Sequence, residues 1–285
     1  MKIIKYIFFI LLFLIVSLLV LFFVNDKLNQ TVMVTKYTFA DEKIPSAFSN
    51  CKLMVISDLH NADFSEQIIK KVKKHNPDYV VITGDMVQLP DHDIDNTVKI
   101  AKALADMEIP LYAVSGNHDR QCGKYDEIID ILWANDVYML ENSSIRLEKD
   151  GESIALIGIK DPRHDEITDE KMRVIRGNIE YELSRRNLFS ILLSHRADLY
   201  PGIKDTGVDL ILSGHLHGGI VRLPFVGGII GRNGKNSLFP DYEYGIFKEG
   251  NSATMIVSGG CDKNPDKRRY FMPSFEPMSG NTSVL

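Results

Sequence analysis

The sequence predicts an α/β protein, because strand-like and helix-like segments alternate along much of the chain. Seven short apolar runs, rich in β-branched residues, have the length of strands. Continuous apolar runs of this kind indicate strands buried on both faces. Helical patterns at 65–75, 95–107 and 124–134 separate the early runs, so this half should form a largely parallel sheet with helices outside. The seven runs are 53–57, 79–83, 111–115, 154–159, 189–194, 210–213 and 254–258.

The composition is that of an ordinary globular protein and excludes a disordered or collagenous chain. Of the 285 residues, 45% are hydrophobic and 25% are charged. The net charge of -5 provides no basic surplus, which argues against nucleic acid as the main partner. Cys51, Cys122 and Cys261 are widely spaced and form neither a disulfide framework nor a zinc knuckle. Nothing in the composition points to a protein partner.

The amino-terminal segment has the pattern of a membrane anchor. Tyr6–Val24 contains no charged residue, and at about 1.5 Å per residue it would cross a hydrocarbon core about 30 Å thick. Lys2 and Lys5 precede it, so the start should stay in the cytoplasm. A cleaved signal peptide is the alternative, but no small-residue cleavage site follows the apolar run. Residues 1–24 are therefore predicted to be an uncleaved, single-pass signal-anchor in the cell membrane, with the remaining chain outside the cytoplasm.

The chain after the anchor divides into three parts. Residues 25–50 are predicted to be a tether with an edge strand near Thr31–Phe39, and residues 51–262 hold the main domain. Within this domain, 218–250 is rich in glycine and should form long loops with hairpins. Residues 263–285 are polar and contain prolines without a clear strand pattern, so we expect a flexible terminus there.

Residues that can bind metal ions follow most of the predicted strands directly. Asp58 and His60 alternate after the first run, so in an extended chain both would point the same way. A single histidine is most often a surface or core residue, and a single aspartate after a strand is most often a turn residue. Five coincident strand ends argue against that interpretation, because ligands of α/β sheets bind beyond the carboxyl ends of the strands. The later groups are Gly84-Asp85, Gly116-Asn117-His118-Asp119, Ser194-His195 and Gly214-His215-Leu216-His217.

These motifs, in this order, resemble the calcineurin-like metallophosphoesterase superfamily. The pattern D-x-H, GD, GNHD, a lone histidine and GHxH covers residues 58 to 217. The anchor, the triplet Ser194-His195-Arg196 and the glycine-rich stretch after His217 resemble a bacterial membrane-associated branch that acts on phosphodiesters or lipid-linked pyrophosphates. The resemblance implies a four-layered α/β/β/α sandwich, here preceded by one transmembrane helix.

The resemblance also implies two metal sites. Asp58, His60, Asp85 and His217 would hold one ion, and Asp85 would bridge to the other. Imidazole and oxygen ligands without thiolate suit manganese, iron or zinc. Two such ions, about 3.5–4 Å apart, lower the pKa of a bridging water and orient the ester. The second ion would be held by Asp85, Asn117, His195 and His215.

His118 is expected to act on the leaving group, and Gln88 is expected to change the properties of His118. In the family, the histidine at the position of His118 is not a ligand and protonates the leaving oxygen or neutralises its charge. The second motif usually runs GDxxD, and the second aspartate pairs with that histidine. Here Gln88 occupies the position. A neutral amide supplies less charge than a carboxylate, so the metal site should survive while the tuning of His118 should differ.

The expected activity is hydrolysis of a phosphodiester, phosphomonoester or pyrophosphate bond, in a lipid-linked or cell-envelope substrate. Two alternatives remain open. A protein serine/threonine phosphatase would share the chemistry, but an outward-facing domain argues against it. A non-catalytic module would hold metals or a lipid headgroup without turnover, although the full ligand set with His118 argues for catalysis. Turnover of bis-p-nitrophenyl phosphate that is lost on chelation separates the hydrolase from the binding module. Activity on diesters rather than phosphopeptides separates it from the protein phosphatase.

Overall fold

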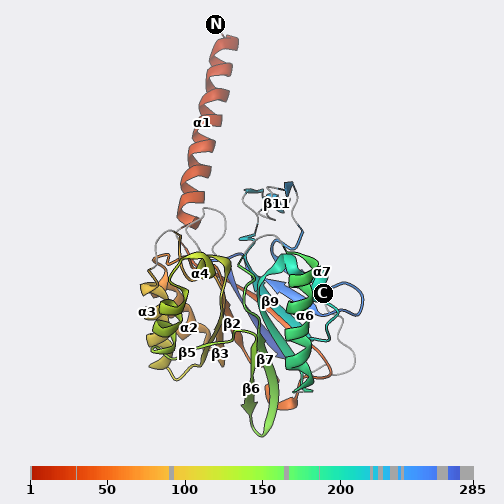
Figure 1. The fold of residues 1–285 in the computed structure, drawn as a ribbon. Coiled ribbons are helices and arrows are strands. Elements are labelled where there is room, and N and C mark those ends of the chain that lie inside the picture. Colours follow the sequence, from red (N-terminus) through yellow and green to blue (C-terminus); the bar gives the residue numbers. More distant parts are fainter. Residues whose placement is uncertain are drawn as a thin grey trace.

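A computed structural model describes residues 2–29, 31–89, 93–163, 167–185, 187–218, 221–223, 227–231, 237–238, 241–261 and 269–276. Two six-stranded sheets pack face to face, and helices cover the outer face of each sheet (Figure 1). The prediction of an α/β protein with four layers is therefore confirmed.

The first sheet has the strand order β1-β15-β2-β3-β4-β5. The pairs from β2 to β5 are parallel, as predicted for this half. Helices α2 (Ser65–His75), α3 (Asp95–Ala105) and α5 (Tyr125–Trp133) lie outside this sheet. Its strands are β1 (Met33–Ala40), β15 (Arg269–Glu276), β2 (Leu53–Ile56), β3 (Tyr79–Thr83), β4 (Leu111–Val114) and β5 (Val137–Met139).

The second sheet has the strand order β13-β14-β9-β8-β7-β6 and is mixed, because its two outer pairs are antiparallel. Helices α6 (Asp169–Ser184) and α7 (Tyr200–Ile203) pack on its outer face. Its strands are β13 (Gly245–Phe247), β14 (Thr254–Val257), β9 (Leu210–Gly214), β8 (Ser190–Arg196), β7 (Glu152–Gly158) and β6 (Ser143–Lys149).

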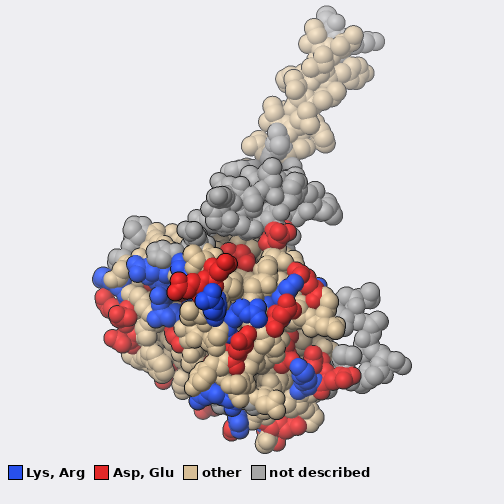
Figure 2. Space-filling model, turned by 45° about the vertical axis from the view of Figure 1, so that its right-hand side comes forward, with Lys and Arg blue, Asp and Glu red and all other residues tan. Residues whose placement is uncertain are grey.

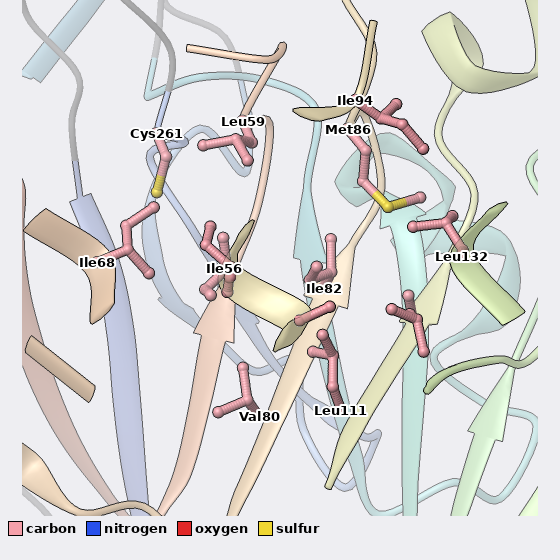
Figure 3. Packing of buried hydrophobic residues seen from close by; sticks show 14 of the residues in the cluster. Ile56, Leu59, Ile68, Val80, Ile82, Met86, Ile94, Leu111, Leu132 and Cys261 are labelled. Carbon is pink, nitrogen blue, oxygen red and sulfur yellow. The ribbon is translucent and has the colours of Figure 1, made fainter. Parts of the chain in front are cut away.

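Alternation along the central strands divides the apolar side chains among three cores. In β2, Leu53 and Val55 belong to the core between the sheets, whereas Met54 and Ile56 face the helices. This is the two-residue period of a strand whose faces are both covered. Figure 3 shows the helix side of the first sheet, where Ile56 and other strand residues pack among helix and loop residues.

The structure of the carboxyl-terminal region differs from the predicted flexible terminus. Residues 269–276 are not a flexible terminus: they form β15, which lies within the first sheet between β1 and β2. It runs parallel to β1 over its whole length and meets β2 only at the pair of Phe271 with Val55. Pro273 lies inside this strand, and a proline counts against a strand when the sequence is read alone. Strand β15 forms nonetheless, because β1 and β2, which are far away in the sequence, supply its pairing partners.

Helix α1 (Lys2–Asn29) projects away from the two sheets (Figure 1). In the part of the chain that the structure describes, no helix has the length and apolarity that a membrane span requires. The predicted membrane-spanning signal-anchor at residues 1–24 is therefore not supported.

A small antiparallel sheet projects from the same end of the domain as α1 (Figure 1). It consists of β10 (Val221–Leu223), β11 (Gly227–Gly231) and β12 (Ser237–Leu238), which confirms the predicted hairpin in the glycine-rich segment. On the face of the molecule shown in Figure 2, basic and acidic side chains are interspersed rather than gathered by sign.

Candidate metal centre

Four of the predicted ligands form one compact group at the carboxyl ends of β2, β3 and β9. Each has a ligand-type atom within 4.8 Å of the others, and all four side chains are buried. The two closest carboxylate–imidazole approaches are 3.6 Å between His217 Nε2 and Asp58 Oδ1, and 3.7 Å between His60 Nε2 and Asp85 Oδ2. The members of this group are Asp58, His60, Asp85 and His217.

A second group shares Asp85 with the first and adds His195 and His215. His195 Nε2 lies 3.3 Å from Asp85 Oδ2 and 3.2 Å from His215 Nδ1. It also lies 3.1 Å from Oδ1 of Asn117, the first residue of helix α4 (Asn117–Gln121). The structure thus brings all seven predicted ligands together, with Asp85 between the two groups.

The local backbone differs from the predicted extended chain. Asp58 and His60 have φ of 52° and 46°, and Asp85, His215 and His217 also have positive φ. Residues other than glycine rarely adopt this left-handed region of backbone conformation. The backbone strain that it costs is found mainly at functional sites. Strand alternation therefore does not explain how Asp58 and His60 converge, and that prediction was wrong. Tight left-handed turns bring them together.

Glycines beside the ligands make room for neighbouring ligands. A Cβ on Gly84 would lie 2.6 Å from His195 Nδ1. A Cβ on Gly116 would overlap the Asp85 carboxylate, and one on Gly214 would overlap Ser57 and Asp58. The φ of 91° at Gly84 is a second reason for glycine at this position, because residues with a side chain rarely adopt that angle. Each glycine therefore lets two strand-end loops approach closely enough to form the centre.

Backbone carbonyls orient two of the histidine rings. The carbonyl of Thr83 lies 2.7 Å from His195 Nδ1, and that of Val87 lies 3.2 Å from His60 Nδ1. A carbonyl only accepts, so both Nδ1 atoms donate and both Nε2 atoms face the ligand groups. His60 Nε2 is buried and has no hydrogen-bond partner among the described residues. A buried imidazole nitrogen that faces carboxylates in this way fits a divalent ion.

Charge within the centre shifts the pKa values of its members. Burial alone would raise the pKa of Asp85, but its charge interaction and hydrogen bond with His195 hold this pKa well below the ordinary range. Burial alone would lower the pKa of His195, whereas the Asp85 carboxylate raises it to about 10. Burial and the nearby charges of His195 and Arg196 lower the pKa of His215. The Asp85 carboxylate and the His195 imidazole therefore each favour the charged form of the other.

His118 differs from the ligands because it is only partly buried. Its ring packs edge-on against His60 at a centroid separation of 4.5 Å, and its backbone N–H donates to Asp85 Oδ1 at 2.8 Å. It therefore lies beside the first ligand group and is partly open to solvent. Gln88 is exposed, and its amide donates to the carbonyl of Leu89 at 3.0 Å.

Asp119 was not predicted to have a structural role, but it joins two of the loops. Its buried Oδ1 accepts from the N–H groups of Met86 and Val87, each at 2.9 Å. Its Oδ2 accepts from the N–H of Gly116 at 2.8 Å. Asp119 thus ties the loop after β3 to the loop after β4. Its place in the GNHD motif was the one available signal in the sequence.

Arg196 and Asp161 form a buried ion pair behind the second group that sequence reasoning also missed. Arg196 Nε donates to Asp161 Oδ2 at 2.9 Å, and Arg196 Nη1 lies 3.4 Å from His215 Nε2. The triplet Ser194-His195-Arg196 drew attention to Arg196, but nothing near Asp161 in the sequence indicated its partner.

The chain is similar to known metallophosphoesterases, as the metal-ligand geometry suggests. The model of the calcineurin-like phosphoesterase family matches residues 51–219. The uncharacterized metallophosphoesterase YkuE of Bacillus subtilis is 30% identical over 213 residues, which are 70% of this chain and 69% of that protein. A zebrafish (Danio rerio) protein named "Transmembrane protein with metallophosphoesterase domain" is 26% identical over 194 residues, which are 62% of this chain and 43% of that protein.

Among solved structures, TT1561 of Thermus thermophilus shares the fold, with a TM-score of 0.50 and 12% identity. The alignment covers 74% of this chain and 90% of that one. The family match spans more than half of the chain and contains all seven residues of the two ligand groups. The chain therefore belongs to the calcineurin-like phosphoesterase family, and it is a metal-dependent phosphohydrolase.

Proposed function

We propose that the protein hydrolyses a phosphodiester, phosphomonoester or pyrophosphate bond with two divalent ions bound at the two ligand groups. The observation that carries this proposal is the shared Asp85. Its carboxylate takes part in both groups, and the other members of each group are buried around it. A bridging carboxylate between two sets of imidazole and oxygen ligands is suited to a pair of ions that act on one substrate.

In this proposal each side chain has a defined role. Asp58, His60 and His217 hold one ion, and Asn117, His195 and His215 hold the other. When bound, the ions supply Lewis-acid stabilisation of the phosphate oxygens and a lowered pKa for water between them. His118, at the solvent side, donates a proton to the leaving oxygen. Manganese, iron and zinc fit the ligand set, which lacks thiolate.

We further propose that the enzyme works at a membrane, within a branch of the family that acts on lipid-linked or other cell-envelope phosphate esters. Support comes from α1, in which every side chain from Tyr6 to Val16 is apolar or aromatic and exposed. A continuous exposed apolar surface favours contact with lipid. The name of the zebrafish relative is consistent with membrane attachment. Lys2 and Lys5 favour an orientation with the catalytic domain outside the cytoplasm.

Metal analysis of wild type and Asp85→Asn tests the proposed chemistry. Purified wild type should contain two ions per chain and turn over bis-p-nitrophenyl phosphate, and a chelator should abolish turnover. Asp85→Asn should lose at least one ion and reduce turnover to background, because both groups lose their common carboxylate. Asp205→Asn, at an exposed position, is the matched control and should behave as wild type. Active wild-type protein with one ion or none would contradict the two-ion proposal.

A further inference from the structure

A pair of cations gathers around one aromatic ring beside the metal centre. The guanidinium carbon of Arg120 lies 4.9 Å from the centroid of the Tyr125 ring, and Lys160 Nζ lies 4.6 Å from the same centroid. Arg120 belongs to α4, Tyr125 begins α5, and Lys160 follows the end of β7. The electron-rich ring attracts both cations, so two positive charges lie around one side chain.

Contacts on one side connect this cation pair to the second ligand group. The Tyr125 hydroxyl donates to Glu141 Oε2 at 2.6 Å, and Glu141 Oε1 accepts from the N–H of Ser115 at 2.9 Å. Ser115 lies two residues before the ligand Asn117. Arg120 lies in the same short helix as Asn117.

On the other side, Asp161, the residue after Lys160, connects the two cations to the second ligand group. Asp161 accepts from Arg196, and Arg196 contacts His215 of the second ligand group. Gln121 of α4 also donates to the backbone carbonyl of Arg163, which ties the loop after β7 to this helix. The cation pair therefore has a defined place next to the second ligand group rather than a loose position on the surface.

Among the described residues, Glu141 is the carboxylate that interacts with both cations. Glu141 is the one carboxylate paired with Lys160 among the described residues, at 3.8 Å, and it already accepts hydrogen bonds from Tyr125 and Ser115. Arg120 makes no ion pair with a carboxylate in the described part of the chain. Both cations are partly buried, so water screens their charge less than on an open surface. An anion bound at the two cations would therefore neutralise positive charge that Glu141 alone does not balance.

We propose that Arg120 and Lys160 bind a second phosphate of the substrate, joined to the phosphate that reacts at the metal centre. This inference rests on the proposed function and narrows its substrate class to diphosphates. Hydrolysis of the bridge consumes one water molecule. The water oxygen bonds to the attacked phosphorus, the bond from that phosphorus to the bridging oxygen breaks, and that oxygen leaves on the second phosphate. A guanidinium and an ammonium suit that leaving group, because phosphate accepts several charge-assisted hydrogen bonds.

The experiment compares three substrates with full-length wild type, Arg120→Met and Lys160→Met. Bis-p-nitrophenyl phosphate has one phosphate, ADP-ribose is a soluble nucleotide diphosphate, and farnesyl diphosphate in detergent micelles is a lipid diphosphate. Each variant should lose about 10- to 100-fold in kcat/KM on at least one diphosphate, mainly through KM, and little on bis-p-nitrophenyl phosphate. Lys160→Arg should recover most of the loss. The diphosphate that shows the selective loss identifies the nucleotide or the lipid source.

Lys124→Met is the matched control, because Lys124 is half-exposed between α4 and α5 and pairs with Glu127. It should leave all three activities unchanged. Equal losses on one-phosphate and two-phosphate substrates would assign Arg120 and Lys160 a structural role and overturn the inference. Wild type that cleaves bis-p-nitrophenyl phosphate but neither diphosphate would also overturn it. Wild type without activity on any of the three would instead contradict the proposed function itself.

Discussion

Individual side chains in the centre are distinguished by burial and by their hydrogen-bond partners. His60 and His195 are buried, and each donates from Nδ1 to a backbone carbonyl, which directs Nε2 toward Asp85. His118 comes from the same cluster of loops but is partly exposed. Ligand histidines need a fixed neutral nitrogen, whereas a proton donor needs access to the substrate. These environments are consistent with the different roles proposed above for His118 and for the ligand histidines.

His118→Gln tests the role of this residue as proton donor. We expect turnover of a diester with an alkyl leaving group to fall by about 10²- to 10⁴-fold, because an alkoxide leaves poorly without a proton. Turnover of bis-p-nitrophenyl phosphate should fall much less, since p-nitrophenolate is a stable anion. Metal content, measured by elemental analysis, should equal that of wild type. The same loss on both substrates would show that His118 acts in another way.

At the scale of elements, the centre depends on loops that follow parallel strands and on the groups that connect these loops. The loop after β3 carries Asp85, and Asn117 begins helix α4 after the loop that follows β4. The Asp119 carboxylate accepts hydrogen bonds from three backbone N–H groups of these two loops. Behind them, the ion pair of Arg196 with Asp161 supports His215. Buried charges of this kind need fully paired partners, and here they position the ligands.

Asp119→Ala should destabilise the protein by about 3 kcal/mol, because three buried N–H donors lose their acceptor. The measurement is the free energy of unfolding from urea denaturation, with exposed Asp205→Ala as the control. Metal affinity should also fall by about 10- to 100-fold, as is usual when groups that orient ligands are removed. An unchanged unfolding curve would mean that water replaces the carboxylate and that the loops do not depend on it.

At the scale of the whole molecule, the centre lies where the two sheets meet. Strands β2, β3 and β4 of the first sheet and β8 and β9 of the second end there. Helix α4, which contains Asn117 and His118, lies at the end of the domain from which α1 projects (Figure 1). The fold thus directs the centre and the apolar helix toward the same side, as the proposed attachment to a membrane would require.

Vesicle flotation tests this arrangement. The full-length protein should float with phospholipid vesicles, and a chain without residues 2–29 should remain at the bottom of the gradient while it still hydrolyses bis-p-nitrophenyl phosphate. Protease added to intact cells should digest the catalytic domain if it lies outside the cytoplasm. Full-length protein that stays at the bottom of the gradient would contradict membrane attachment, and a protected domain would reverse the proposed orientation.

Much of the fold and the ligand set could be predicted from the sequence, because both depend on local patterns. Apolar runs located β2, β3 and β4, and helical periodicity located α2 with its observed ends, Ser65 and His75. Ligand-type residues follow strand ends directly, so their order along the chain was enough to predict that they meet. What the pattern could not predict was the left-handed turn at Asp58 and His60, because φ depends on how the surrounding loops pack.

Other features depend on contacts between distant parts of the chain. Strand β15 contains Pro273 and forms because β1 and β2 offer it pairing partners more than two hundred residues earlier. Arg120 and Lys160 share the ring of Tyr125 only because α4 and the end of β7 meet in the folded protein. The sequence by itself determined the residue types, the positions of the central strands along the chain and the class of chemistry. The tertiary structure decided the backbone conformation of the ligands and the surroundings of the centre, since these follow from non-local packing.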